Sequence, residues 1–260
     1  MAVQLAGCDP RVMAEAAKLN ADRGARLIDI NFGCPVKKVV GGHAGSALMR
    51  DEAHAARLLE ATVRAVDLPV TLKMRTGWDD RSRNAPTLAR IAEDCGIRMV
   101  TVHGRTRCQF YAGTADWAFI REVKQAVSIP VIANGDITSL DEADRALAQS
   151  GADGLMIGRG CYGRPWFVAQ VIEWLRHRRR RPDPPLAAQY AAVRAHYEAM
   201  LNHYGSAVGL RIARKHLGWY SKGLPGSAEF RAAANQTEEV PKVKALLRAF
   251  YEPLTEREAA

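Results

Sequence analysis

The sequence lacks most features of secreted, zinc-bound or membrane proteins. Its five cysteines are odd in number and scattered, with no C-x-x-C pair; they are Cys8, Cys34, Cys95, Cys108 and Cys161. This argues against a disulfide framework or a structural zinc site. A run of about 18 apolar residues is missing, as is a basic-then-apolar leader. We therefore expect a cytoplasmic protein with reduced thiols, no metal and no membrane contact.

The composition is that of a globular protein. The chain has 260 residues, of which 48% are hydrophobic and 25% charged. A chain of this size can bury a large core, and one large domain plus a smaller one fits its length.

The net charge of +9 is concentrated in the last third of the chain. Residues 1–167 carry 22 Lys and Arg against 19 Asp and Glu, and residues 168–260 carry 15 against 9. A basic region beside a near-neutral body suits a polyanion, although basic residues also solubilise surfaces. The run Arg176–Arg181 is ambiguous in the same way, because it is either a solvated linker or an RNA contact.

Short apolar runs alternate with helix-like segments over the first two thirds of the chain. This order, with strands that are apolar throughout, predicts a parallel sheet covered by helices. The expected strands are 3–5, 27–32, 70–75, 99–103, 130–134 and 154–158, and the expected helices are 10–22, 51–66, 85–95, 117–126 and one capped near Ser139 or Asp141. After Phe167 only helices are expected, at 168–176, 186–204, 208–220 and 241–251. The predicted domains are residues 1–167 and 168–260.

The informative residues stand at or near the end of each predicted strand. They are Asn31, Lys73, His103, Asn134 and Gly158. They would meet at one rim, which is the layout of a (β/α)8 barrel with its site at the C-terminal face. A doubly wound sheet is the alternative, but no G-x-G-x-x-G follows an early strand.

A cysteine stands where the second strand opens into a loop. Asn31-Phe32-Gly33-Cys34-Pro35 follows the apolar run, and two lysines and a glycine-rich turn come next. Residues just past the ends of parallel strands face the ligand crevice, so Cys34 is placed for chemistry. The alternative is a buried structural cysteine.

This motif resembles the signature of the tRNA-dihydrouridine synthases, flavoenzymes that reduce uracil bases in tRNA. The run from Leu210 to Gly226 is similar to the family as well, and the resemblance covers essentially the whole chain. The bacterial branch close to the nitrogen-regulation-associated, B-type protein is the most similar. Family members have two strands before the one at residues 3–5, so the chain resembles an N-terminally truncated (β/α)8 barrel with strands three to eight, followed by a helical bundle. We expect such a chain to be poorly soluble or to hold flavin weakly.

The resemblance implies FMN as cofactor, NADPH as electron donor and tRNA as substrate. Cys34 would be the acid that protonates C5 of uracil while reduced FMN gives a hydride to C6; a thiol is mostly protonated at neutral pH. Asn31 would orient flavin or base, and Lys37 the RNA backbone. No protein partner is implied, and the full-length protein is expected to be a monomer.

Three predicted strand ends carry side chains suited to a flavin. Lys73 is a cation at the end of an apolar strand, which is costly unless an anion or a salt bridge meets it. The family places such a lysine beside the anionic reduced flavin. His103 is either a satisfied polar residue or, by resemblance, a flavin ligand, with Arg105 on the substrate side. Gln4 can both donate to and accept from the pyrimidine edge.

Glycine-containing turns follow the last two strands. Small residues there let backbone N–H groups approach a phosphate, although glycine also ends strands in any protein. The expected phosphate-side residues are Asn134, Gly135, Asp136, Gly158 and Arg159. The helical region would hold the tRNA, with Arg211, Arg214, Lys215 and Lys222 as candidates. Two other functions stay open: an FMN barrel oxidoreductase acting on a small molecule, and a catalytically impaired tRNA-binding fragment.

Overall fold

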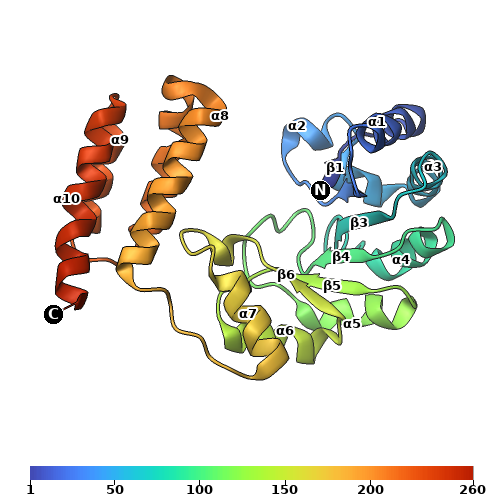
Figure 1. Cartoon of the computed structure of the whole chain (residues 1–260). Helices are drawn as coiled ribbons and strands as arrows, with labels where there is room; N and C mark the ends of the chain where they lie inside the picture. Colours follow the sequence, from blue (N-terminus) through green and yellow to red (C-terminus); the bar gives the residue numbers. More distant parts are fainter. Residues whose placement is uncertain (260) are drawn as a thin grey trace. The chain divides into compact units, whose positions relative to one another are not determined.

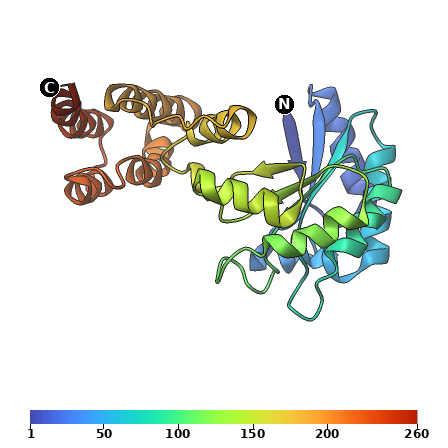
Figure 2. The same cartoon turned by 90° about the horizontal axis from the view of Figure 1, so that it is seen from below.

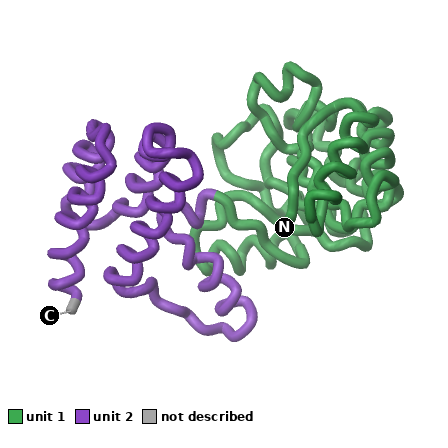
Figure 3. Tube along the Cα trace, turned by 45° about the horizontal axis from the view of Figure 1, so that its top comes forward, with its two compact units in different colours: residues 1–158 green, residues 159–260 purple. Residues whose placement is uncertain are grey.

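The computed structural model describes residues 1–259 and divides the chain into two compact units. Unit 1 comprises residues 1–158 and unit 2 residues 159–260 (Figure 3). The expected boundary at residue 167 thus differs from the observed one. The segment after the last strand, which includes the short 3-10 helix η2 (Arg159–Cys161), is grouped with the helices that follow.

Unit 1 is built on one parallel sheet whose strands lie in sequence order (Figure 1). The order β1-β2-β3-β4-β5-β6 excludes a doubly wound sheet, in which the strand order reverses, and is that of a (β/α) barrel. The predicted strands are confirmed, with small changes of boundary: β1 (Ala2–Leu5), β2 (Leu27–Phe32), β3 (Val70–Arg75), β4 (Val100–His103), β5 (Val131–Asn134) and β6 (Gly154–Met156).

Helices cover one face of this sheet (Figures 1 and 2). Alternate residues of β2 and β3, such as Ile30 and Leu72, are fully buried on that face. Asp51 accepts from the backbone N–H of His54 and Ser139 from that of Glu142, and these N-caps fix where two helices begin. The covering helices are α1 (Pro10–Asp22), α3 (Glu52–Arg64), α4 (Ala85–Asp94), α5 (Trp117–Ala126) and α6 (Leu140–Ser150).

The other face of the sheet is polar, so the expectation of strands that are apolar throughout is wrong. In β2 buried residues alternate with partly exposed ones, and Asp29 and Asn31 are among the partly exposed residues. The cross-strand register continues this face, because Asn31 pairs with Lys73 and Arg75 with His103. These polar residues lie toward the carboxyl ends of their strands, which is where barrel proteins build their sites.

Within residues 159–259 of unit 2 the regular elements are all helices, and they enclose a core of their own. The helices are α7 (Phe167–His177), α8 (Leu186–Tyr220), α9 (Ser227–Gln236) and α10 (Val240–Ala259). The two helices expected at 186–204 and 208–220 form α8, which is interrupted at Gly205 with φ 74°. Val193, Tyr197 and Leu217 of α8 pack with Phe230 of α9 and Tyr251 of α10.

Helix α9 is absent from the sequence-based expectation. Only Phe230, Ala234 and Ser227 of this helix are buried, so its apolar periodicity is too weak to stand out. Across the described residues, no helix is long and apolar enough to cross a membrane.

With the observed boundary, the charge asymmetry is sharper. Unit 1 carries 20 Lys and Arg against 19 Asp and Glu, and unit 2 carries 17 against 9. Nearly all of the excess positive charge therefore belongs to the helical unit.

Candidate functional site

The peptide groups on both sides of Cys34 are held by hydrogen bonds. The Asn31 side-chain oxygen accepts from the backbone N–H groups of Gly33 (3.0 Å) and Cys34 (2.9 Å). The Cys34 carbonyl accepts from the N–H (3.1 Å) and the hydroxyl (2.9 Å) of Ser46. Gly45 has φ 61°, and a Cβ there would lie 2.8 Å from the Cys34 oxygen. The backbone that carries the thiol is therefore fixed, as a positioned reactive group requires.

Arg75 connects this loop to the loop after β4. Its side chain is 2% exposed; Nε donates to the Gly33 carbonyl at 2.9 Å, and one terminal nitrogen donates to the carbonyls of Thr106 (2.8 Å) and Phe110 (2.9 Å). Burial lowers the pKa of Arg75, while Tyr111 raises it and Arg105 lowers it. A buried guanidinium held by three carbonyls ties two site loops to the sheet.

Sequence reasoning missed Arg75 and Ser46 as site residues. The signal for Arg75 was present, because the period-two pattern of a strand places it on the same face as Lys73 and directly beside His103. Ser46 carries no such signal, since its role depends on the turn at Gly45.

Lys73 lies on the polar face of the sheet, in β3. Burial, and then the neighbouring Arg75, lower its pKa to about 8, and Asp29 opposes this shift. Among residues 1–259 its ammonium forms no hydrogen bond and no ion pair. Asp29 is itself engaged, by the Gln4 amide at 2.6 Å and the Thr71 hydroxyl at 2.6 Å. A desolvated, unpaired cation is an energetic cost that an anionic ligand would remove.

Gln4 is part of the same network. Its amide nitrogen binds Asp29, and its oxygen accepts from the Asn31 amide at 2.8 Å. The two residues expected to face flavin or base therefore hold each other, and Asn31 also holds the Cys34 loop.

His103 lies among cations at the end of β4. Burial, followed by the charges of Arg75, Lys73 and Arg105, lowers its pKa to about 3, and Asp136 opposes this. Its ring packs on Gly135, where a Cβ would lie 2.7 Å from the ring carbon Cδ2, and Gly135 has φ 118°. Glycine at 135 is thus explained by the close approach of the histidine ring and by its backbone angle.

Arg105 and Asp136 form a bidentate pair in the loops after β4 and β5. The two N–O distances are 2.9 and 2.5 Å, and Arg105 is 2% exposed. The guanidinium also donates to the carbonyls of Ala112 (3.0 Å) and Gly113 (2.6 Å). Both side chains are thus engaged within the protein, and the substrate contact expected of Arg105 and the cofactor contact expected of Asp136 stay predictions.

The other predicted site residues near the strand ends and the Cys34 loop are Asn134, Gly158, Arg159 and Lys37. Asn134 closes β5 and donates to the Met156 carbonyl at 2.7 Å. Gly158 ends unit 1 with open space where a Cβ would stand, and Arg159 belongs to unit 2. Lys37 is exposed at the start of α2 (Lys37–Val40), just past Cys34.

The basic residues predicted to bind RNA lie on or just after α8 in unit 2. Arg211, Lys215 and Lys222 are exposed, and Lys215 stands 5.8 Å from the centre of the Trp219 ring. Arg214 is half-buried and donates to the Thr237 carbonyl at 3.1 Å. Three of the four candidates are therefore open to solvent on this unit.

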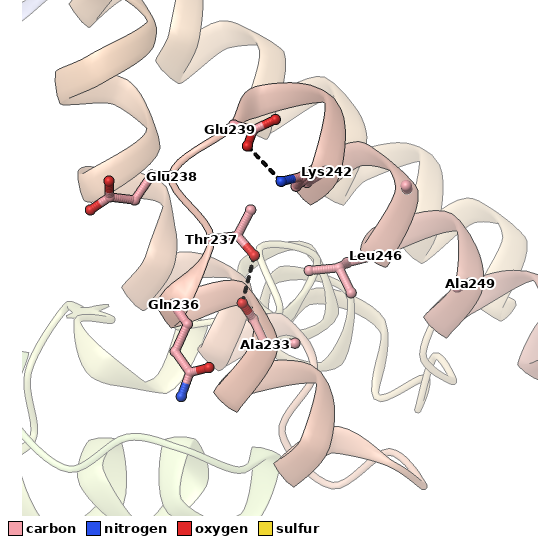
Figure 4. A pocket seen from close by; sticks show the side chains of 9 residues that line it. Ala233, Gln236, Thr237, Glu238, Glu239, Lys242, Leu246 and Ala249 are labelled. Carbon is pink, nitrogen blue, oxygen red and sulfur yellow. Dashed lines mark hydrogen bonds and ion pairs between the residues drawn. The ribbon is translucent and has the colours of Figure 1, made fainter.

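A groove of about 770 Å³ lies between α9 and α10 (Figure 4). Thr237, Glu239, Lys242 and Leu246 are among its lining residues, and Lys242 pairs with Glu239 at 2.6 Å. None of the sequence-predicted site residues lines it. Within residues 1–259 no group of three or more His, Cys, Asp or Glu side chains is arranged to hold a metal.

The strand order and the polar strand ends define a parallel β/α barrel-type protein, with a positioned thiol and buried cations at the carboxyl ends of its strands. The dihydrouridine synthase (Dus) family model matches residues 1–255. The chain belongs to this family.

Two relatives with tRNA-dihydrouridine synthase names and one solved structure illustrate what the chain is similar to. A probable tRNA-dihydrouridine synthase from Rickettsia conorii is 60% identical over 98% of this chain and 77% of its own length. The tRNA-dihydrouridine synthase B from Xanthomonas campestris is 54% identical over 98% of this chain and 76% of its own length. A putative phosphonomutase structure from Burkholderia cenocepacia has a TM-score of 0.45 and 23% identity, covering 59% of this chain and 66% of that one.

Proposed function

We propose that the protein reduces uridine to 5,6-dihydrouridine in tRNA, with FMN as cofactor and NADPH as electron donor. The proposal rests on two features of neighbouring strands. One is the hydrogen-bonded loop that carries Cys34 after β2, and the other is the Lys73 ammonium of β3, which has no partner among residues 1–259. The names of the similar proteins support the tRNA substrate.

The residues at the strand ends fit FMN. Lys73 has no hydrogen-bond partner among residues 1–259, and the buried guanidinium of Arg75 adds positive charge beside it. These groups would hold an anionic ring edge, and the open space at Gly158 leaves room for a phosphate. FMN, when bound and reduced, supplies the hydride for C6 of the uracil ring.

Cys34 would supply the proton. Its thiol gives up the proton to C5 of uracil, and the thiolate regains one from water. Asn31 and Ser46 hold the Cys34 backbone so that the sulfur keeps its position during this transfer. Arg75 contributes by fixing the Gly33 carbonyl.

The tRNA would be held mainly by unit 2. A base stacked in tRNA must be extruded before it can react, at a cost of a few kcal/mol. Contacts of Arg211, Lys215 and Lys222 with phosphates would offset this cost. Lys37 is exposed near Cys34 and suits a phosphate of the extruded nucleotide. We propose a cytoplasmic monomer in which unit 1 binds FMN and unit 2 binds tRNA.

Two assays on the purified chain test this function. The first measures flavin absorbance after addition of FMN, and the second measures dihydrouridine in tRNA after addition of NADPH. Both should be positive. Flavin binding with reduction of a small molecule only would identify another barrel oxidoreductase. Binding of tRNA with neither flavin nor product would identify an RNA-binding fragment.

A further inference from the structure

The ion pair between Arg105 and Asp136 sits against one edge of the His103 ring. A terminal nitrogen of Arg105 lies 3.3 Å from Nε2 of His103, and the same nitrogen is 2.9 Å from Asp136. A guanidinium can only donate hydrogen bonds, so Nε2 must be the acceptor in this contact. A neutral imidazole that accepts at Nε2 carries its proton on Nδ1.

The packing of the ring supports the same orientation. The Cδ2 and Nε2 atoms face Gly135, since a Cβ at that position would lie 2.7 and 3.0 Å from them. His103 is 7% exposed, so the ring has little space to turn over. Among residues 1–259, Nδ1 has no hydrogen-bond partner. The N–H on Nδ1 is therefore a donor that has no partner within these residues.

We propose that Arg105 and Asp136 are positioning residues that hold His103 as a neutral imidazole with its proton on Nδ1. Asp136 keeps the guanidinium in place, and Arg105 both blocks protonation of Nε2 and fixes the ring. His103 then presents a permanent hydrogen-bond donor to a ligand acceptor atom, such as a carbonyl oxygen or ring nitrogen of a planar cofactor. The identification of that acceptor as FMN rests on the proposed function, whereas the tautomer does not.

The charges around His103 agree with a neutral ring. Lys73 and Arg75 approach it from β3 and Arg105 from the loop after β4, while Asp136 from the loop after β5 is the counter-ion. Tyr111 lies 6.4 Å away between ring centres. Three cations against one carboxylate, which is already paired with Arg105, oppose a second proton on the ring.

The test is NMR of the 260-residue chain with ¹⁵N-labelled histidine. The chain has seven histidines, and the His103→Gln variant assigns the signals of His103. The expected pattern is a protonated Nδ1 and an unprotonated Nε2 that persist from pH 8 to pH 5. A proton on Nε2, or titration of the ring near pH 6.5, would overturn the proposal without any further variant.

Variants separate positioning from simple packing. Arg105→Gln should allow a mixture of tautomers and protonation of His103 at a higher pH, and Arg105→Lys should restore the wild-type pattern because it keeps a cationic donor. Arg83→Gln is the matched control, since Arg83 pairs with Asp116 at 2.8 Å in the same unit; it should leave His103 unchanged. A wild-type pattern in Arg105→Gln would show that the tautomer is set elsewhere.

Addition of FMN distinguishes this proposal from the proposed function. A change in the Nδ1 signal, with the tautomer retained, would support both. An unchanged signal in a chain with the expected tautomer would support the positioning role and count against the flavin contact.

Discussion

The two units satisfy their polar groups in different ways. In unit 1 the buried cations Arg75 and Arg105 bind carbonyls and a carboxylate inside the protein, and Lys73 stays unpaired. In unit 2 the candidate RNA-binding cations Arg211, Lys215 and Lys222 are exposed. The first arrangement costs desolvation energy and suits a specific anionic ligand. The second suits a long, screened polyanion. The comparison predicts that the reaction takes place in unit 1 and that unit 2 supplies most of the affinity for tRNA.

The largest effect is expected from Cys34→Ala. Loss of a positioned acid should lower tRNA reduction by a factor of about 10² or more, while FMN stays bound and reducible by NADPH. Stopped-flow flavin reduction and dihydrouridine analysis measure the two steps separately. Cys108→Ala removes an exposed thiol of the same unit and should change neither step. Undiminished product formation in Cys34→Ala would remove Cys34 from the mechanism.

Lys73→Met should act on the cofactor. Loss of a charged hydrogen bond costs about 1.5–3 kcal/mol, so FMN affinity should fall by about 10- to 100-fold. Flavin fluorescence titration measures this change. Lys124→Met is the control, because Lys124 pairs with Asp153 at 2.8 Å on the sheet's helical side. Equal FMN affinity in Lys73→Met and wild type would place the flavin elsewhere.

A triple variant tests the basic surface of unit 2. Each phosphate contact contributes about 0.7–0.9 to the slope of log affinity against log salt. Replacing Arg211, Lys215 and Lys222 by Gln should therefore make this slope shallower by about 2 to 3. Filter binding of tRNA at several salt concentrations gives the slope.

The matched control removes the same charge from α10. Lys242, Lys244 and Arg248 are paired with Glu239, Glu198 and Glu252 at 2.6, 2.6 and 3.6 Å. Their replacement by Gln should change the slope less. If both triple variants behave alike, only net charge matters, and the proposed surface on α8 is wrong.

The smallest effect is expected in acid stability. The pKa of His103 is lowered from 6.5 to about 3, so between these values the unfolded chain binds a proton that the folded chain does not. Stability should therefore fall as the pH drops below 6.5, by at most about 1.4 kcal/mol per pH unit from this group. Urea unfolding at pH 7, 6 and 5 measures it. His103→Gln should show a shallower dependence, and an identical slope would show that His103 does not contribute.

Much of the fold could be predicted from the sequence because its signals are local. Apolar runs marked the six strands, and Asp51 and Ser139 marked helix starts through their caps. Helix α9 could not be predicted, since its burial comes from tertiary contacts of Phe230 and Ala234. The polar inner face does not follow from an interpretation of the short strands as apolar throughout, because burial alternates along β2.

The site was predictable in its positions and less so in its contacts. Asn31, Lys73 and His103 could be placed because parallel strand ends share one rim. The engagement of Arg105 by Asp136 could not be foreseen, because it depends on how two loops fold around Gly135. The position of Arg75 on the polar face could be predicted from the two-residue alternation of a strand, whereas the position of Ser46 depends on the turn at Gly45.

The most direct test of the proposed reaction is an anaerobic single turnover. The flavin-loaded chain is reduced with one equivalent of NADPH and mixed with unmodified tRNA, and flavin absorbance and dihydrouridine are followed together. We predict one dihydrouridine for each flavin reoxidised by wild type, with both steps slowed about 10²-fold or more in Cys34→Ala. Reoxidation without dihydrouridine, or equal rates in the two proteins, would contradict reduction of tRNA with Cys34 as the acid.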